Sequence, residues 1–268
     1  SDTDTANTFS VSGKVFEDYN YGGGAGRDFT TSGGSARQSA RVELYDSFDG
    51  TFISATTTDA SGNYTFTGLN PDNYVVRVVN STVTSSRTGY VATLIPVQTY
   101  RTDASTGTVT AVTNYVGGEN PCSTDAASNT TSATLASLTS GILSGATVGT
   151  CSGQAANVPQ SVTTVDLSSG NVTGIDFGYN FDTIVNPKNT GQGSLRQFIT
   201  NANALSNTGL AQVGLTAGRD TTVFMISNGS SAAGLRSALN YFSSGAASIP
   251  IATSLPTVTD TVTLDGTT

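Results

Sequence analysis

The sequence contains no histidine and no tryptophan, and Lys14 and Lys188 are its only lysines. Without histidine, Ser-His-Asp triads, Cys-His pairs and histidine-ligated metal sites are excluded. Charged residues make up 11% of the 268 residues and the net charge is −8, so the chain lacks the basic stripe that binds a nucleic acid backbone. It also lacks any run of about 18 apolar residues, so we expect no membrane-spanning segment.

Ser, Thr, Asn and Gly occupy most polar positions. A surface rich in hydroxyl and amide groups, with few charged groups, favours an extracellular protein. The polar opening SDTDTANT, with neither an initiator Met nor a signal peptide, is typical of a mature, processed product. In an exported chain, Cys122 and Cys151 are predicted to form a disulfide, and two buried free thiols are the alternative.

Short alternating segments dominate the first two thirds of the chain. In FSVSGKVFE and ARVELYD, apolar residues recur at every second position, which predicts half-buried β-strands. Turn signals recur every 8 to 12 residues, the spacing of an antiparallel sandwich. We predict that Tyr64, Phe66 and Tyr74 belong to its core, and that SVTTVDLSSGNVTGIDFGYNF (161–181) folds as a hairpin around Ser-Ser-Gly-Asn.

The composition divides the chain into regions. Residues 1–8 are read as an N-terminal extension and 9–183 as a β-sandwich domain. A Ser-, Thr-, Ala- and Gly-rich stretch at 102–160 is read as an insertion that carries the disulfide, with a helical turn around SATLASL. DTIVNPKN is read as the boundary before a second region at 184–268.

The second region opens with a helical pattern in NTGQGSLRQFITNANAL. Ser194 and Gln197 have the spacing of a capping box. The apolar residues at helical spacing predict one buried face: Leu195, Phe198, Ile199, Ala202 and Leu205.

VSGKVFEDYNYGG, ARVELYD and TTTDASGNYTFTGLNPDNYVVRVV, together with GIDFGYNF, resemble the Cna B-type/carboxypeptidase-regulatory-like domains of bacterial surface proteins. The resemblance implies an Ig-like or transthyretin-like antiparallel sandwich. NTGQGSLRQFITNANAL, TTVFMI and IPIATSLPTVTDTVTLDGTT resemble the entry of right-handed parallel β-helix domains, in which a helix caps the end of the solenoid. The expected fold class is therefore all-β: a sandwich followed by a cap helix and the first coils of a β-helix.

A solenoid needs about three coils to bury its core, and 184–268 provides one or two. Either the chain belongs to a longer protein, or the missing coils come from a neighbouring subunit. An open β edge is a template for strand addition. The partners expected are therefore further copies of the chain or further domains of the same polypeptide.

EDYNYGGGAGRD offers a candidate calcium loop, and calcium is the only cofactor for which we find candidate ligands. Asp18, Asn20 and Asp28 supply the hard oxygen atoms that calcium prefers. In related sandwiches this place carries D-x-N-x-D-G, whereas here Tyr21 and Gly22 stand where the second Asp-Gly pair is expected. An Asn- and Gly-rich turn without metal is the alternative that we favour.

The resemblance to Cna B-type domains also raises the question of a Lys–Asn isopeptide bond. Lys14 in the first strand and Asn180 in the last match the lysine and the amide. The Glu that promotes the bond normally follows the Tyr74 motif by four residues, and that position is Val78. Without this acid we expect no bond.

Catalysis by paired carboxylates remains possible without histidine, but we read Asp220, Asp260 and Asp265 as turn residues. We therefore predict a non-enzymatic structural or adhesive protein of the cell surface or extracellular matrix that assembles into filaments by strand addition. The alternatives are a carbohydrate-binding module, with surface glycans as ligands, and an inert spacer within a larger surface protein.

Overall fold

The structure is a computed structural model that describes residues 8–135, 151, 154 and 156–266. The predicted extension at 1–8, apart from Thr8, and part of the predicted helical turn at 132–138 lie outside the described residues. The described part of the chain is mainly β-structure, with helices α1 (Phe29–Ser32) and α3 (Leu195–Ala204) and a 3-10 turn at Asn80–Thr82. No helix described there has the length and apolar character that crossing a bilayer requires.

A seven-stranded sheet forms one layer of the sandwich. The order is β12-β1-β13-β7-β8, with β2 and β5 also paired to β1. Gly13 in β1 allows a close approach, because a Cβ atom there would lie 1.7 Å from the carbonyl oxygen of Ile175. The strands are β1 (Phe9–Glu17), β2 (Ser35–Ala36), β5 (Asn63–Leu69), β7 (Val97–Asp103), β8 (Thr110–Val112), β12 (Val172–Thr173) and β13 (Phe177–Asn180).

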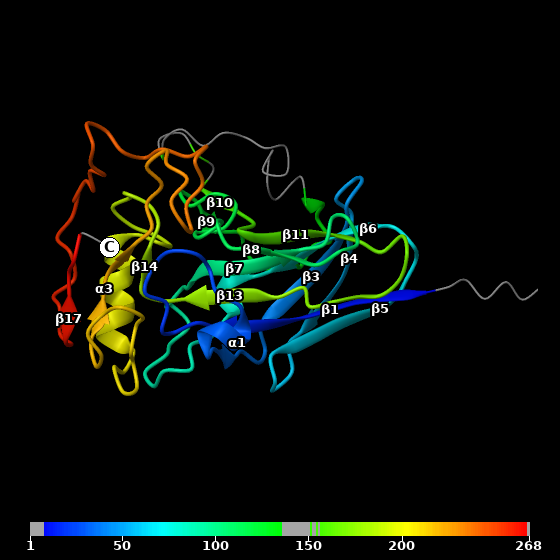
Figure 1. The fold of residues 1–268 in the computed structure, drawn as a ribbon, viewed down its shortest axis with the longest axis horizontal. Helices are drawn as coiled ribbons and strands as arrows, with labels where there is room; N and C mark the ends of the chain where they lie inside the picture. The colour runs from blue at the N-terminus through cyan, green and yellow to red at the C-terminus, as the bar shows by residue number, and fades with distance from the viewer. Residues whose placement is uncertain (1–7, 136–150, 152–153, 155, 267–268) are drawn as a thin grey trace, which may run out of the picture.

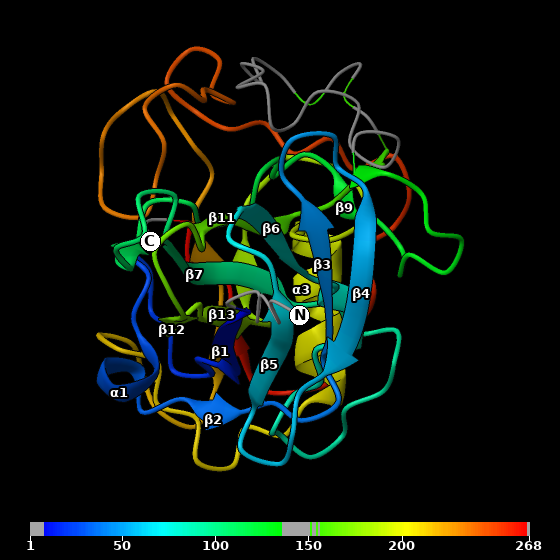
Figure 2. The same ribbon diagram turned by 90° about the vertical axis from the view of Figure 1, so that its right-hand side faces the viewer.

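A four-stranded sheet forms the other layer, in the order β11-β6-β3-β4 (Figures 1 and 2). All its neighbouring pairs are antiparallel. Its strands are β3 (Arg41–Asp46), β4 (Phe52–Thr57), β6 (Asn73–Val78) and β11 (Ser161–Asp166).

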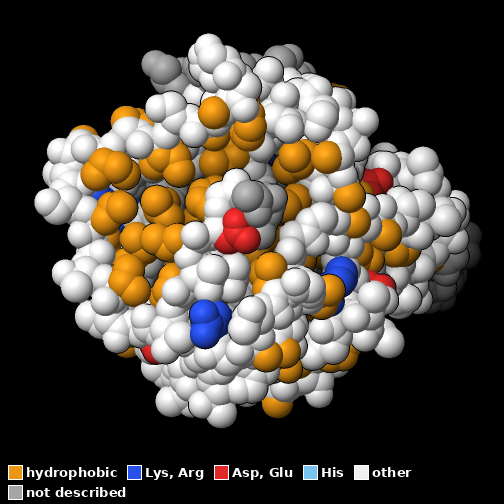
Figure 3. Space-filling model, turned by 60° about the vertical axis from the view of Figure 1, so that its left-hand side comes forward, with side chains coloured by type: hydrophobic (Ala, Val, Ile, Leu, Met, Phe, Trp, Pro, Cys, Tyr) orange, Lys and Arg blue, Asp and Glu red, His pale blue; other side chains and the backbone are white. Residues whose placement is uncertain are grey.

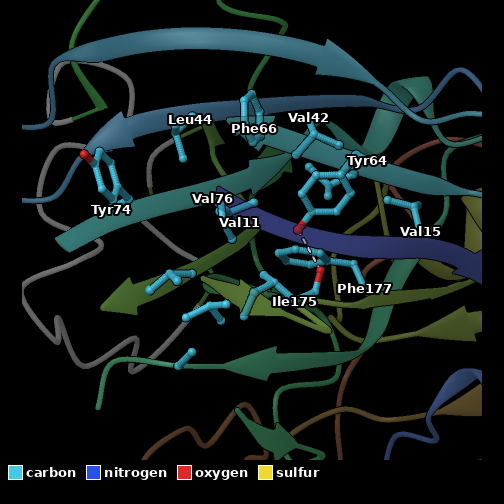
Figure 4. Packing of buried hydrophobic residues seen from close by; sticks show 14 of the residues in the cluster. Val11, Val15, Val42, Leu44, Tyr64, Phe66, Tyr74, Val76, Ile175 and Phe177 are labelled. Carbon is cyan, nitrogen blue, oxygen red and sulfur yellow. Dashed lines mark hydrogen bonds between the residues drawn. The ribbon is translucent and has the colours of Figure 1, made fainter. Parts of the chain in front are cut away.

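One apolar cluster fills the space between the two sheets (Figure 4). It contains the predicted core aromatics, all at most 6% exposed: Tyr64, Phe66 and Tyr74. The Tyr64 hydroxyl donates a hydrogen bond to the Ile175 carbonyl oxygen at 2.6 Å (Figure 4). The alternating pattern of the sequence therefore packs as predicted, as a β-sandwich.

The connection after β11 differs from the predicted hairpin. Residues 161–181 do not form one, because β11 pairs with β6 in the four-stranded sheet while β12 pairs with β1 in the seven-stranded sheet. The turn around Ser-Ser-Gly-Asn therefore carries the chain from one sheet to the other. A turn sequence is compatible with either outcome, and in the observed arrangement both Val165 of β11 and Val172 of β12 lie in the apolar cluster between the sheets.

The insertion begins later than its composition suggests. β7 and β8 belong to the seven-stranded sheet, so residues up to Val112 are part of the sandwich. Beyond them, a segment containing β9 (Thr124–Asp125) pairs with β10 (Asn157–Val158). This segment reaches the outer face of the four-stranded sheet, where Leu135 packs against Tyr45 and Val162.

The predicted boundary at 182–189 is a packed junction in the structure. β13 leads almost directly into β14 (Thr183–Ile184), and Thr183, Ile184 and Val185 are at most 3% exposed. β14 pairs in parallel with β16 (Val223–Phe224), and β15 (Asp220–Thr221) pairs in parallel with β17 (Val262–Thr263). These strands and α3 lie together at the side of the molecule farthest from the start of β1 (Figure 1).

Candidate functional site

Three passes of the chain stack into a parallel ladder, formed by residues 181–186, 220–226 and 261–265. The middle pass bonds to both neighbours. The Met225 N–H donates to the Ile184 carbonyl at 2.7 Å, and the Thr222 N–H donates to the Thr263 carbonyl at 3.0 Å. The paired residues of successive passes lie 40 to 42 positions apart in the sequence.

β17 is the outermost strand of this ladder among the described residues. The carbonyl groups of Thr261 and Thr263 both accept bonds from the middle pass. In a parallel ladder, successive residues bond to opposite sides. The N–H and C=O of Val262 therefore point away from the middle pass, in the direction from which another strand would pair.

Helix α3 packs over the ladder, and its start follows the predicted cap. The Ser194 Oγ accepts a bond from the Gln197 N–H at 3.2 Å. The reciprocal half of the capping box is not formed, because the Ser194 N–H donates to the Gly191 carbonyl at 3.2 Å. The Gln197 side chain instead donates to the Asn201 side chain, one turn further along, at 2.8 Å.

The predicted cap residues divide between two apolar clusters. Phe198, Ile199 and Ala202 pack with Ile184 and Ile226 of the ladder, and Leu195 lies at the rim of that cluster. Leu205 instead joins a cluster formed with Leu94 and Phe181. The helix therefore fastens the ladder to the sandwich as well as covering the ladder's apolar side.

The disulfide joins Cys122 and Cys151, which are 29 residues apart. Both cysteines pack in the same apolar cluster as Phe198 and Ile184. The Lys188 ammonium group donates to the Cys122 carbonyl at 2.9 Å. The bridge thus fixes the inserted segment against the start of the ladder.

An apolar hollow of about 420 Å³ opens beside the outer passes of the ladder. Figure 3 shows hydrophobic side chains gathered around a depression on this face. The apolar side chains that line the hollow are Phe224, Ile226, Leu235, Phe242, Ala246, Ala247 and Ile249.

A buried ionic cluster links the sandwich to the first two passes. Both Arg87 Nη1 contacts to the Asp182 carboxylate are 3.1 Å, and Arg87 Nη2 lies 2.6 Å from Asp220 Oδ1. Asp220 Oδ2 is buried without a partner among the described residues. Burial, reinforced by the Asp182 carboxylate, raises the pKa of Asp220 to about 8, although Arg87 opposes the rise.

A second ionic cluster fastens the inserted segment to the four-stranded sheet. The fully buried Arg77 donates to Glu43 at 2.8 Å and lies 3.5 Å from Asp125. Asp125 also accepts the N–H groups of Asn80 and Gln160. Burial nevertheless raises the pKa of Asp125 to about 6. The sequence analysis did not predict these ionic clusters. The acidic partners of Arg77 and Arg87 lie 34 to 133 residues away along the chain, so no local pattern relates them.

The three candidate calcium ligands have separate partners in the structure. Asp18 is buried and ion-paired with Arg27, and burial raises its pKa to about 6. The Asn20 side-chain oxygen accepts the Ala211 N–H at 2.7 Å. Asp28 caps α1 by accepting the N–H groups of Thr30 and Thr31. Among the described residues, no group of three acidic or sulfur-bearing side chains is arranged to hold a metal ion.

Lys14 and Asn180 face different surroundings. The Lys14 ammonium group donates to the Asn63 side chain at 2.8 Å and lies over the Phe29 ring. Asn180 is buried, and its amide donates to the Asp18 carbonyl at 2.9 Å. The candidate isopeptide residues are thus each bound to other groups.

No family model matches the sequence. The solved structures that it resembles include the shaft pilin SpaA from Lactobacillus rhamnosus GG, at 16% identity over 32% of this chain and 40% of the pilin chain, with a TM-score of 0.20. Two mutant forms of that pilin are each 12% identical. They cover 67% and 68% of this chain and 52% and 53% of their own, with TM-scores of 0.25 and 0.23. Because these scores are low, the following proposals rest on the contacts of this chain alone.

Proposed function

We propose that this chain is a structural protein of the cell surface or extracellular matrix, and that its parallel ladder accepts a further β layer along β17. The observation that carries the proposal is the outward direction of the Val262 N–H and C=O beside an apolar hollow. An added strand would satisfy those backbone groups and cover the apolar side chains. If a second copy of the chain supplies this β layer, the chain is a subunit of a filament.

The chemistry of the surface and of the cysteines supports an extracellular location. Charged residues are few, and disulfides such as Cys122–Cys151 persist mainly in oxidising compartments. The proposal assigns no reaction to the chain. The buried carboxylates of Asp182 and Asp220 are bound to Arg87 rather than presented to a substrate.

Electron microscopy and sedimentation of the purified chain test this proposal. Val262→Pro removes the outward N–H and leaves the bonds from the middle pass in place, so it should fold and fail to assemble. Thr263→Pro is the matched control, because it disrupts the bonded side of the same strand and should lower stability. A wild-type chain that stays monomeric at all concentrations would overturn the filament proposal.

A polar cleft favours glycan binding as the second candidate function. It has a volume of about 460 Å³, and its lining includes Tyr19, Ser86, Thr88, Ser206 and Thr208. Hydroxyl groups beside one aromatic ring suit a sugar. Binding of a defined polysaccharide by a monomer, lost on Tyr19→Ala, would support the carbohydrate-binding module. A monomer with neither activity would support an inert spacer.

A further inference from the structure

A second polar hollow adjoins the polar cleft that Tyr19 lines. This Arg37 hollow also has a volume of about 460 Å³, and both volumes lie in the roughly 300–1,000 Å³ found for ligand pockets. Ser35 and Ser86 line the hollow as well as the cleft, so the two form one continuous groove. A chain-like ligand that enters the cleft therefore has a path past these two serines to Arg37.

The groove carries positive charge, although the net charge of the chain is −8. Among the described residues, no acidic side chain lines the cleft or the hollow. Arg87, which lines the cleft, is bound to Asp182 and Asp220. Of the lining residues, Arg37 is therefore the cation that remains to meet a ligand, and its side chain is 13% exposed.

The Arg37 guanidinium group is held on one side and open on the other. Its Nε donates to the Ser35 carbonyl at 3.2 Å, and its Nη2 donates to Ser35 Oγ at 2.7 Å. Nη1 makes no hydrogen bond among the described residues, because the Glu17 carboxylate, its ion-pair partner, lies 4.0 Å away. A guanidinium group fixed in this way is prepared for the paired N–H contacts that it makes with a carboxylate.

The two shared serines present opposite halves of a hydrogen bond. Ser86 Oγ donates to the buried Glu17 carboxylate at 2.7 Å, so it offers an acceptor to the groove. Ser35 Oγ accepts from Arg37, so its own hydrogen remains to be donated. A sugar hydroxyl both donates and accepts, so neighbouring hydroxyls of a sugar satisfy both serines, whereas a carboxylate satisfies only Ser35.

We infer that this groove binds an acidic polysaccharide, with a uronate carboxylate on Arg37 and sugar hydroxyls on Ser35 and Ser86. The inference rests on the second candidate function, glycan binding, and names the class of glycan. It is independent of assembly along β17, so Val262→Pro should bind the polysaccharide as the wild type does.

Polygalacturonate, a homopolymer of a uronic acid, is the probe. Its methyl ester is the matched ligand, because esterification removes the charge and keeps the hydroxyl groups. In calorimetric titration, the wild type should bind polygalacturonate at least tenfold more tightly than the ester, and Arg37→Gln should remove this preference. Arg219→Gln, which removes one positive charge outside the groove, should bind as the wild type does. An Arg37→Gln variant that keeps the preference would overturn the inference.

Ala60 provides a test that leaves Arg37 in place. It is exposed and lines the Arg37 hollow. Ala60→Glu should weaken the binding of polygalacturonate and Ala60→Lys should strengthen it, each by about threefold. Opposite changes distinguish an electrostatic contact from a loss of folding, and thermal melting verifies the fold of each variant. Changes of the same sign in both variants would contradict the inference.

The inference and the glycan candidate fail in different ways. Equal affinity for polygalacturonate and its ester, with both lost on Tyr19→Ala, would overturn the inference and leave glycan binding standing. Equally tight binding of polyglutamate would show that the groove selects negative charge rather than sugar, and it would also overturn the inference. A wild-type chain that binds neither polygalacturonate nor a neutral polysaccharide such as dextran would overturn both.

Discussion

The sandwich and the parallel ladder are both β-structure, but different interactions hold them together. The main sandwich strands have six to nine residues and enclose one continuous apolar cluster. The ladder strands have two residues each. Side chains bonded to backbone compensate for this shortness: Gln212 bonds both the N–H and the C=O of Thr221, and Asn201 donates to the Phe181 carbonyl.

This contrast shows what each region needs from the chain. A sandwich needs apolar residues at alternate positions, and many substitutions of similar size preserve it. A ladder of short strands needs particular polar side chains at particular places, because each satisfies a backbone group that the short strands leave unpaired. The ladder should therefore be the more sensitive region to single polar substitutions.

The largest effect should come from Arg87→Ala. It leaves Asp182 and Asp220 buried without their cation, which costs about 3–5 kcal/mol of unfolding free energy. Phe177→Ala, in the sandwich core, should cost a similar amount through a cavity, about 3–5 kcal/mol. Urea unfolding measures both, and hydrogen exchange should show the Arg87 variant opening first at the Met225 amide. If Arg87→Ala lowered the unfolding free energy by less than about 1 kcal/mol, the ladder would not depend on particular polar side chains as proposed.

Removing the disulfide should have the next largest effect. For a separation of 29 residues, the loop-entropy relation gives roughly 3–4 kcal/mol. The double variant Cys122→Ala/Cys151→Ala should therefore melt well below the wild type. Because both cysteines pack against α3, exchange should rise at the ladder and α3 before it rises in the sandwich. Uniform loss of protection in both regions would argue against a local role.

Asp220→Asn should change the pH dependence of stability. The pKa of Asp220 in the folded chain, about 8, exceeds its ordinary value of 3.8. Its contribution is therefore fully present below about pH 4 and is lost as the pH rises through about 8. The variant should flatten this decline by at least about 1.4 kcal/mol, the equivalent of one pKa unit. Asp125 and Asp18, whose pKa values are also raised, keep a residual slope. Chemical unfolding at pH 5 and pH 8.5 measures the difference, and parallel curves for both proteins would contradict the prediction.

The smallest effect should come from Ser194→Ala, which removes the acceptor for the Gln197 N–H. Loss of an N-cap typically costs about 1 kcal/mol. Gln197→Ala is the control: its side chain does not complete the capping box, so it should cost less than Ser194→Ala. Equal losses in thermal melting would contradict this order of the two effects.

Local features of the structure were largely predictable. Alternation identified β1 and β3, helical spacing with Ser194 identified α3, and the two cysteines identified the bridge. The direction of each connection was not predictable, since the turn after β11 joins two sheets as readily as it would close a hairpin. The ionic clusters could not be found either, because no local pattern relates Arg87 to Asp182 and Asp220.

The sequence by itself determined which residues are apolar at period two, where α3 begins and that catalysis by histidine is impossible. These properties depend on neighbouring residues along the chain. Only the tertiary structure decided that Asp220 shares Arg87 with Asp182, that Arg77 is fully buried, and that Val262 turns its backbone outward. Each of these depends on segments that meet only after the chain has folded, where burial replaces water with whichever groups the packing supplies.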